Sequence, residues 1–311
     1  MPEPSSYLGW KIDFANPPGE ASLQHPSSVQ WRIFKNPIAL GVGGVAAVLM
    51  EFADARIRSG VWDHSTYKAD PIGRSKRTGI AAMVGVYGPE SAARRVIAGV
   101  TNMHARVGGQ TPKGETYQAL DTELLDWVAA TAAFGFLNAY DKFVAPVSEA
   151  DKSRFYTEGA KVTRLYGVKR SPNSSADFLD MMNGLKDRFE PHPIVNEFLA
   201  IIQSGRAAPA VPRFLHRALA RASVSILPPL IREHLQLGKE FDLTATDRMM
   251  LKAVGRLAEN IPVKSSPACQ ASVRLGLPWK FPYLSARAQN EALAKAGLAP
   301  PLSTSQPQAA E

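Results

Sequence analysis

Residues 124–140, LLDWVAATAAFGFLNAY, are one of two long apolar stretches that decide how the chain folds. Asp126 and Asn138 interrupt this stretch. The second stretch, 37–50 (PIALGVGGVAAVLM), is shorter than the roughly 18 uncharged apolar residues expected of a membrane span. Both stretches therefore predict helices that lie in the core of a globular protein.

The pattern outside these stretches is also helical. Ala- and Leu-rich windows have apolar residues three and four apart, and the alternation typical of strands is nearly absent. We expect an all-α protein of about eight to ten helices. Capping signals predict helices from Asp70-Pro71 to Gly88, from Pro89 to Gly108-Gly109, and from Asp121 to about Phe143. Further helices are expected at 148–167, where Ser148 and Asp151 suit a capping box, and at 174–189, 193–204, 212–226 and 244–260.

The two ends differ in composition from the interior. Residues 1–30 contain several Pro, Ser and Gly residues and predict an irregular leader, and 300–311 (PPLSTSQPQAAE) predict a disordered tail. The interior shows no repeat and no clear linker. We expect one helical domain over residues 31–299.

Composition excludes several classes of protein. The net charge is +8, but the basic residues are spread along the chain without a zinc-finger or RNA-recognition signature, so we expect no nucleic-acid partner. A single cysteine, Cys269, excludes an intrachain disulfide and a CxxC site. The first residues lack the basic and apolar regions of a signal peptide, which predicts a cytoplasmic protein. HExxH, GxSxG and Walker A motifs are absent, which argues against zinc proteases, serine hydrolases and P-loop enzymes.

One histidine lies on the apolar side of an expected helix. Within 88–109, His104 shares a face with Val96, Val100 and Val107. One interpretation is a core histidine that is hydrogen-bonded to a backbone carbonyl. The other is a metal ligand, since a neutral imidazole on an apolar wall suits haem iron.

The stretch 63–78, DHSTYKADPIGRSKRT, is charged but leads into an apolar helix. Arg74 and Thr78 are neighbours on one face, and Arg77 lies beside them. Arg74 in the first helical turn is suited to bind an anionic group, and the alternative is a solvated helix start with ordinary surface arginines. His64, in the turn WDHS, is either a packing residue or a second ligand.

The segment 212–235 is basic and amphipathic, with Arg213, Arg217 and Arg221 in one row. It suits contact with a membrane surface, or else it is a solvated helix face that Pro228-Pro229 interrupts.

The order of several motifs resembles a known family. GVWDHS, DPIGRSKRT, MHARVGG, YQALDTELLDWV and a SEAD…FYTEG helix follow one another as in the MpaB-type oxygenases, which include the latex-clearing proteins that cleave polyisoprene. The resemblance is strongest over 60–160. It implies a globin-like helical fold that binds haem b, with His104 as the axial ligand and Arg74 and Thr78 beside the haem. Arg77 falls where the rubber-cleaving members carry a lysine.

This chain departs from the family pattern at three places. Ala53-Asp54 stands where many members have His-Pro, and Ala129 stands where many have a histidine. The rubber-cleaving members also use a glutamate as a base, for which Glu51 and Asp54 are the nearest candidates.

The resemblance implies a haem b-dependent oxygenase that cleaves or oxidises a C=C bond of a non-polar, isoprenoid-like substrate with O2. His104 would bind the iron, Arg74, Thr78 and Arg77 would serve catalysis, and His64 would lie near the cofactor. Two alternatives stay open: a non-catalytic haem-binding protein, and a haem-free helical lipid-binding protein in peripheral contact with a membrane. The sequence does not predict an oligomeric state.

Overall fold

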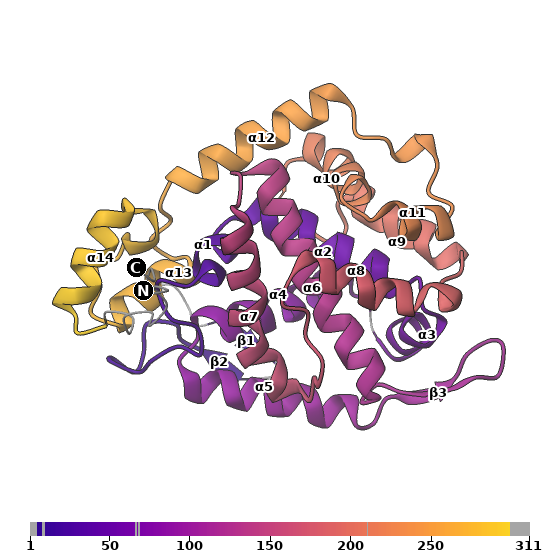
Figure 1. The fold of residues 1–311 in the computed structure, drawn as a ribbon, viewed down its shortest axis with the longest axis horizontal. Coiled ribbons are helices and arrows are strands. Elements are labelled where there is room, and N and C mark those ends of the chain that lie inside the picture. The colour runs from indigo at the N-terminus through magenta and orange to yellow at the C-terminus, as the bar shows by residue number, and fades with distance from the viewer. Residues whose placement is uncertain (1–4, 8–9, 66, 68, 210, 299–311) are drawn as a thin grey trace, which may run out of the picture.

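The computed structural model describes residues 5–7, 10–65, 67, 69–209 and 211–298, so the expected tail at 300–311 lies outside it. In these residues the all-α prediction is confirmed, with fourteen α-helices and two short antiparallel hairpins (Figure 1). The helices are α1 (Val29–Phe34), α2 (Pro37–Glu51), α3 (Ala55–His64), α4 (Pro71–Tyr87), α5 (Glu90–His104), α6 (Thr122–Phe143), α7 (Glu149–Thr163), α8 (Ser175–Gly184), α9 (Pro193–Ser204), α10 (Arg213–Ser225), α11 (Pro229–His234), α12 (Ala245–Asn260), α13 (Pro267–Arg274) and α14 (Ala286–Lys295). The hairpins pair β1 (Ser5–Tyr7) with β2 (Trp10–Ile12) and β3 (Gly108–Gln110) with β4 (Thr116–Gln118).

The helix count is higher than the eight to ten that the periodicity predicted. Helices α1 and α11 have six residues each, and α13 has eight. Such segments are too short to show the periodic pattern from which helices were counted.

The two apolar stretches pack against each other as α2 and α6 at the centre of the protein (Figure 1). Their backbones approach at Gly43 and Gly135, where a Cβ atom on Gly43 would lie 2.7 Å from the Cα of Phe136. Trp127 on α6 also donates a hydrogen bond from Nε1 to the carbonyl oxygen of Met50 near the end of α2, at 3.4 Å. The two helices are therefore in contact from the middle of α2 to its end, and from the second half of α6 back to Trp127.

Most predicted helix boundaries are confirmed, and two are wrong: the helix expected at 174–189 ends at Gly184, before a short 3-10 turn, and the end of α5 also differs. Asp70 caps α4 through its carboxylate, which accepts from the backbone N–H of Gly73 at 2.8 Å, and Gly88 ends the helix. Helix α5 ends at His104, not at Gly108-Gly109. The two glycines instead lie in β3, where a Cβ on Gly108 would overlap the side chain of Gln118 on the opposite strand. The two glycines therefore belong to a strand pair and do not act as a helix stop.

The core has two parts on either side of the α2–α6 pair. One part includes Trp127, which stacks on Phe178 of α8 and on Phe189. The other contains residues of α1, α4, α5 and α7, and Ile12, Phe14 and Leu23 from the expected leader are buried in it. No helix in the described part of the chain is long and apolar enough to cross a bilayer.

Candidate functional site

Arg74 in the first turn of α4 is the centre of the candidate site. Its charge acts on three groups from separate elements: Glu51 at the end of α2, His104 at the end of α5, and Tyr67 in the loop before α4. Its guanidinium also donates a hydrogen bond to the hydroxyl of Thr78, one turn along α4. The fold therefore brings together a carboxyl, an imidazole and a guanidinium that are far apart in sequence.

Glu51 is held in place from α6. The hydroxyl of Thr131 lies 3.4 Å from Oε1 of Glu51 and donates its stronger hydrogen bond, at 2.9 Å, to the carbonyl oxygen of Val128. Burial raises the pKa of Glu51 to about 7, and the Arg74 charge and the Thr131 hydroxyl oppose this effect only in part. A carboxyl with this pKa can gain or lose a proton at neutral pH.

His104 is the last residue of α5 and is half-buried. Val96 and Val100 of its expected apolar face are buried, as predicted. Burial lowers the pKa of His104, and the nearby Arg74 charge lowers it further, so its imidazole is neutral at neutral pH. A neutral imidazole is the form that binds metals.

Tyr67 closes one side of the group. It is buried, its ring lies 6.1 Å from that of Trp62 and 5.4 Å from that of Phe198 of α9, and its hydroxyl bonds with Ser75. Burial raises its pKa to about 12, so the phenol stays protonated and can donate a hydrogen bond.

The other proposed site residues lie in different surroundings. Arg77 pairs with Asp70 at 3.6 Å and lines a depression of about 510 Å³ between α4, Phe14 and Pro267. His64 is exposed at the end of α3, and its ring lies 6.5 Å from that of Tyr117 in β4.

The structure separates the two candidate bases. Asp54 is buried as the N-cap of α3, where its carboxylate accepts from the backbone N–H of Arg56 at 2.9 Å and forms an ion pair with the Arg56 guanidinium at 2.6 Å. That guanidinium also bonds Glu123 at 2.6 Å. Asp54 is thus engaged in a structural network, whereas Glu51 lies in the Arg74 group.

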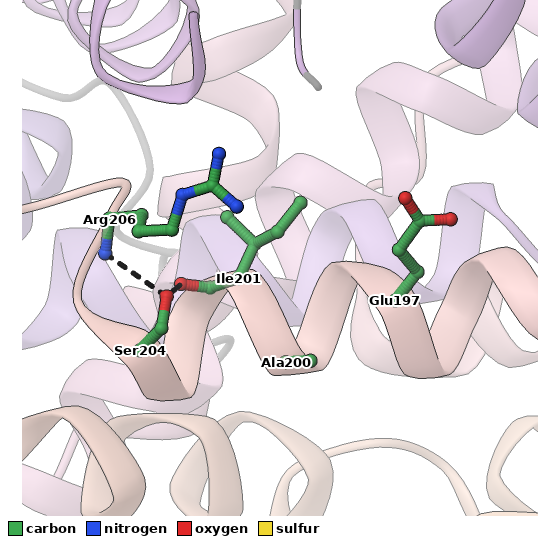
Figure 2. Close-up of a pocket in the computed structure, with 5 residues that line it drawn as sticks. All are labelled: Glu197, Ala200, Ile201, Ser204 and Arg206. Carbon is green, nitrogen blue, oxygen red and sulfur yellow. Dashed lines mark hydrogen bonds between the residues drawn. The ribbon is translucent and has the colours of Figure 1, made fainter. Parts of the chain in front are cut away.

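A second hollow, of about 220 Å³, lies along α9. Figure 2 shows Glu197, Ile201 and Arg206 on the same side of this helix. The hydroxyl of Ser204 accepts from the backbone N–H of Arg206 and donates to the carbonyl oxygen of Ile201, which are local bonds at a helix end. The hollow is small and unconnected with the Arg74 charge, so we do not assign the site to it.

Three residues near the site were missed by sequence reasoning. Tyr67 and Thr131 are described above, and Thr101 on α5, one turn before His104, has a buried hydroxyl without a hydrogen-bond partner in the described residues. Thr131 stands in an apolar run that indicates only a core helix, and Tyr67 stands in a charged loop. Thr101 is three residues before His104, a spacing that places the two side chains on neighbouring parts of one helix face.

A family model described as "ER-bound oxygenase mpaB/B'/Rubber oxygenase, catalytic domain" matches residues 31–260. The matched region runs from α1 to the end of α12 and includes Glu51, Arg74 and His104. This match confirms the resemblance drawn from the motifs. No curated protein and no solved structure matches the chain significantly.

Proposed function

Because the chain belongs to the family of MpaB-type and rubber oxygenases and carries its catalytic domain, we propose that it is a haem b-dependent oxygenase. Its proposed reaction is the cleavage or oxidation of a C=C bond in a non-polar, isoprenoid-like substrate with O2. The observation that carries the proposal is the half-buried, neutral His104 beside Arg74.

The residues present fit a haem. The buried hydroxyl of Thr101, one turn before the half-buried His104, has no hydrogen-bond partner in the described part of the chain. The same residues include no group of three or more His, Cys, Asp or Glu side chains placed to hold a metal ion. A haem iron needs only one axial side chain from the protein, which His104 provides.

Each residue of the group has a proposed role. The haem supplies the activation of O2 when it is bound. His104 holds the iron, and Arg74, oriented by Thr78, binds a propionate or another anionic group. Glu51 is the proposed general base, and the Arg74 charge favours its carboxylate, which is the form that can accept a proton. Arg77 and His64 are proposed only as residues at the edge of this site.

A non-polar substrate finds apolar walls on α4 and α6. Ala81, Ala82 and Met83 of α4 and Ala133 and Phe136 of α6 pack against the core but remain partly accessible. Most of these side chains are small, so a flat or linear apolar molecule could approach the helix backbones closely. This composition is typical of small-molecule sites, which are apolar with a few polar groups.

The visible absorption spectrum tests the haem assignment. Protein produced with a haem precursor should show a Soret band, and its reduced pyridine adduct should show b-type bands. His104→Ala should lose the haem while staying helical, whereas His234→Ala should keep it, because His234 is a helix-end residue bonded to the carbonyl of Leu230. Haem content that is unchanged in His104→Ala would overturn the assignment of the ligand.

Turnover separates an oxygenase from a non-catalytic haem-binding protein. Haem-loaded protein should consume O2 in the presence of a farnesyl-type compound and form carbonyl products. Glu51→Gln should reduce this turnover at unchanged haem content, because it removes the proposed base. Absence of any O2-dependent product from a range of prenyl compounds would favour the non-catalytic alternative.

A further inference from the structure

Helix α12 lies on the upper edge of the molecule and presents an unusual outer face (Figure 1). It packs on α2, α6 and α10 through its inner side, where Leu251 and Gly255 are buried. Both of its acidic residues turn toward the protein. Asp247 pairs with Arg221 of α10 at 3.1 Å, and Glu259 pairs with Lys35 at 2.9 Å and accepts from the Tyr140 hydroxyl at 2.8 Å.

The outer face of α12 carries two parallel rows. Arg248, Lys252 and Arg256 repeat every four residues and form a row of cations. The residue after each of them is apolar, and these residues form the adjacent row, Met249, Ala253 and Leu257. Met249 is 69% exposed and Leu257 is 60% exposed, so both large apolar side chains lie largely in water.

The apolar row continues past the end of the helix. Ile261 is 49% exposed and Val263 is 52% exposed, and Lys264 follows them. The positive potential of the face is felt inside the protein, because the charges of Arg248 and Lys252 add to burial in lowering the pKa of Lys142 on α6. The two rows and the continuing segment together are called the α12 face below.

We propose that the α12 face docks the protein on the surface of a membrane that contains anionic lipids. A helix that lies in the membrane interface has one exposed apolar side that enters the headgroup region and cations beside it that bind lipid phosphates. The rows of the α12 face have this arrangement. A polyanion such as nucleic acid would use the cations but would leave four large apolar side chains in water.

This face differs from the segment 212–235, for which the sequence had suggested membrane contact. On α10, Arg213, Phe214 and Arg217 are exposed, but Arg221 is half-buried and paired with Asp247. The helix ends at Ser225, before Pro228-Pro229. Its outward row is therefore shorter than that of α12, where Arg248, Met249, Ala253, Arg256 and Leu257 are exposed and Lys252 is half-buried.

Vesicle sedimentation of the full chain tests the proposal, with vesicles of phosphatidylcholine alone or mixed with phosphatidylglycerol. The protein should bind the mixed vesicles, and added salt should weaken the binding. The triple variant Arg248→Gln, Lys252→Gln, Arg256→Gln should bind roughly 100-fold more weakly, at about fivefold for each cation. A control with the same change of net charge, Lys161→Gln, Lys186→Gln, Lys295→Gln, alters exposed lysines of α7, α14 and the segment after α8, and should bind nearly as the unmodified protein does.

A second pair of variants tests the apolar row. Leu257→Ser should weaken binding by about tenfold, as expected for losing one inserted Leu side chain. Leu179→Ser removes a similar exposed leucine, on α8, and should leave binding unchanged. Equal binding to vesicles without anionic lipid, equal losses in the two triple variants, or equal behaviour of the two serine variants would each overturn the proposal.

Discussion

The charge of Arg74 in the first turn of α4 acts on Glu51 at the end of α2, yet it does not bring the pKa of Glu51 back to its ordinary value of 4.5. Burial dominates and holds the pKa at about 7. The protein thus keeps a carboxyl at a point where its ionised form is costly. A carboxyl with a pKa near neutrality suits a site that exchanges a proton. The same raised pKa makes the stability of the protein depend on pH, which can be measured.

The first prediction concerns Glu51→Gln. The pKa of Glu51 is higher in the folded than in the unfolded protein, so its stabilising contribution is complete below pH 4.5 and is lost as the pH rises through about 7. Above that pH the variant should be more stable than the unmodified protein by up to about 3 kcal/mol, at 1.36 kcal/mol for each pKa unit. Urea unfolding over this pH range measures the difference.

The control for this prediction is Glu291→Gln. Glu291 is exposed on α14 and, among the described residues, pairs with Arg287, one turn away. This variant should change stability little at any pH. If Glu51→Gln showed the same flat difference, the pKa of Glu51 would not be raised in the folded protein.

The second prediction concerns Arg74→Gln. Loss of the guanidinium charge should raise the pKa of His104 and also that of Glu51, because Arg74 lowers both. Titration of the His104 ring protons by NMR measures the first effect. Arg77→Gln is the matched control, three residues along the same helix, and should leave the His104 titration unchanged. Equal shifts in both variants would show that general helix charge, not the placement of Arg74, acts on His104.

Local signals predicted the helices well, and tertiary contacts account for what they missed. Asp70 and Gly88 mark the ends of α4 because capping depends on neighbouring residues only. Asp121 precedes α6 as predicted, but its carboxylate accepts from the backbone N–H of Gln118 and does not cap the helix. The end of α5 was misplaced because Gly108-Gly109 pair with a strand that lies several residues further on. His104 and Arg74 were selected from their helix faces, and the structure brings them together.

The placement of Glu51 beside Arg74 had no local signal. The sequence left Glu51 and Asp54 as the nearest candidates, both expected on one helix upstream of Arg74, whereas the structure ends α2 at Glu51 and makes Asp54 the N-cap of α3. What separates them is the Arg56 guanidinium that occupies Asp54 and the Thr131 hydroxyl that reaches Glu51 from α6. Such distinctions depend on helix packing, which a single sequence does not reveal.

The third prediction tests the α2–α6 contact through Gly135→Ala. A Cβ at this position would overlap the carbonyl oxygen of Gly43, so the two helix backbones must separate. We expect a loss of about 1–3 kcal/mol in the free energy of unfolding, as for other overpacked cores.

Gly79→Ala on α4 is the control, because nothing lies within 4 Å of its added Cβ. It should stabilise the protein by about 0.5–1 kcal/mol, since alanine favours helix more than glycine does. A Gly135→Ala variant as stable as Gly79→Ala would refute the close contact.

The fourth prediction concerns Arg274, which ties the leader to α4. Its buried guanidinium donates to the carbonyl oxygens of Phe14, Glu20 and Tyr87, at 2.5, 2.8 and 2.8 Å. Arg274→Met would leave the carbonyl oxygens of Phe14 and Glu20 without this donor, and that of Tyr87 would keep only the 3.2 Å hydrogen bond from the Ser22 hydroxyl. The loss should cost about 3 kcal/mol, at 1–3 kcal/mol for each unsatisfied group. Arg287→Met, on the exposed face of α14, should change stability by less than about 0.5 kcal/mol. Urea unfolding of both variants gives the comparison, and limited proteolysis should show earlier cleavage before α1 in Arg274→Met. If the two variants were equally stable and equally resistant, the leader would be held by its apolar residues alone.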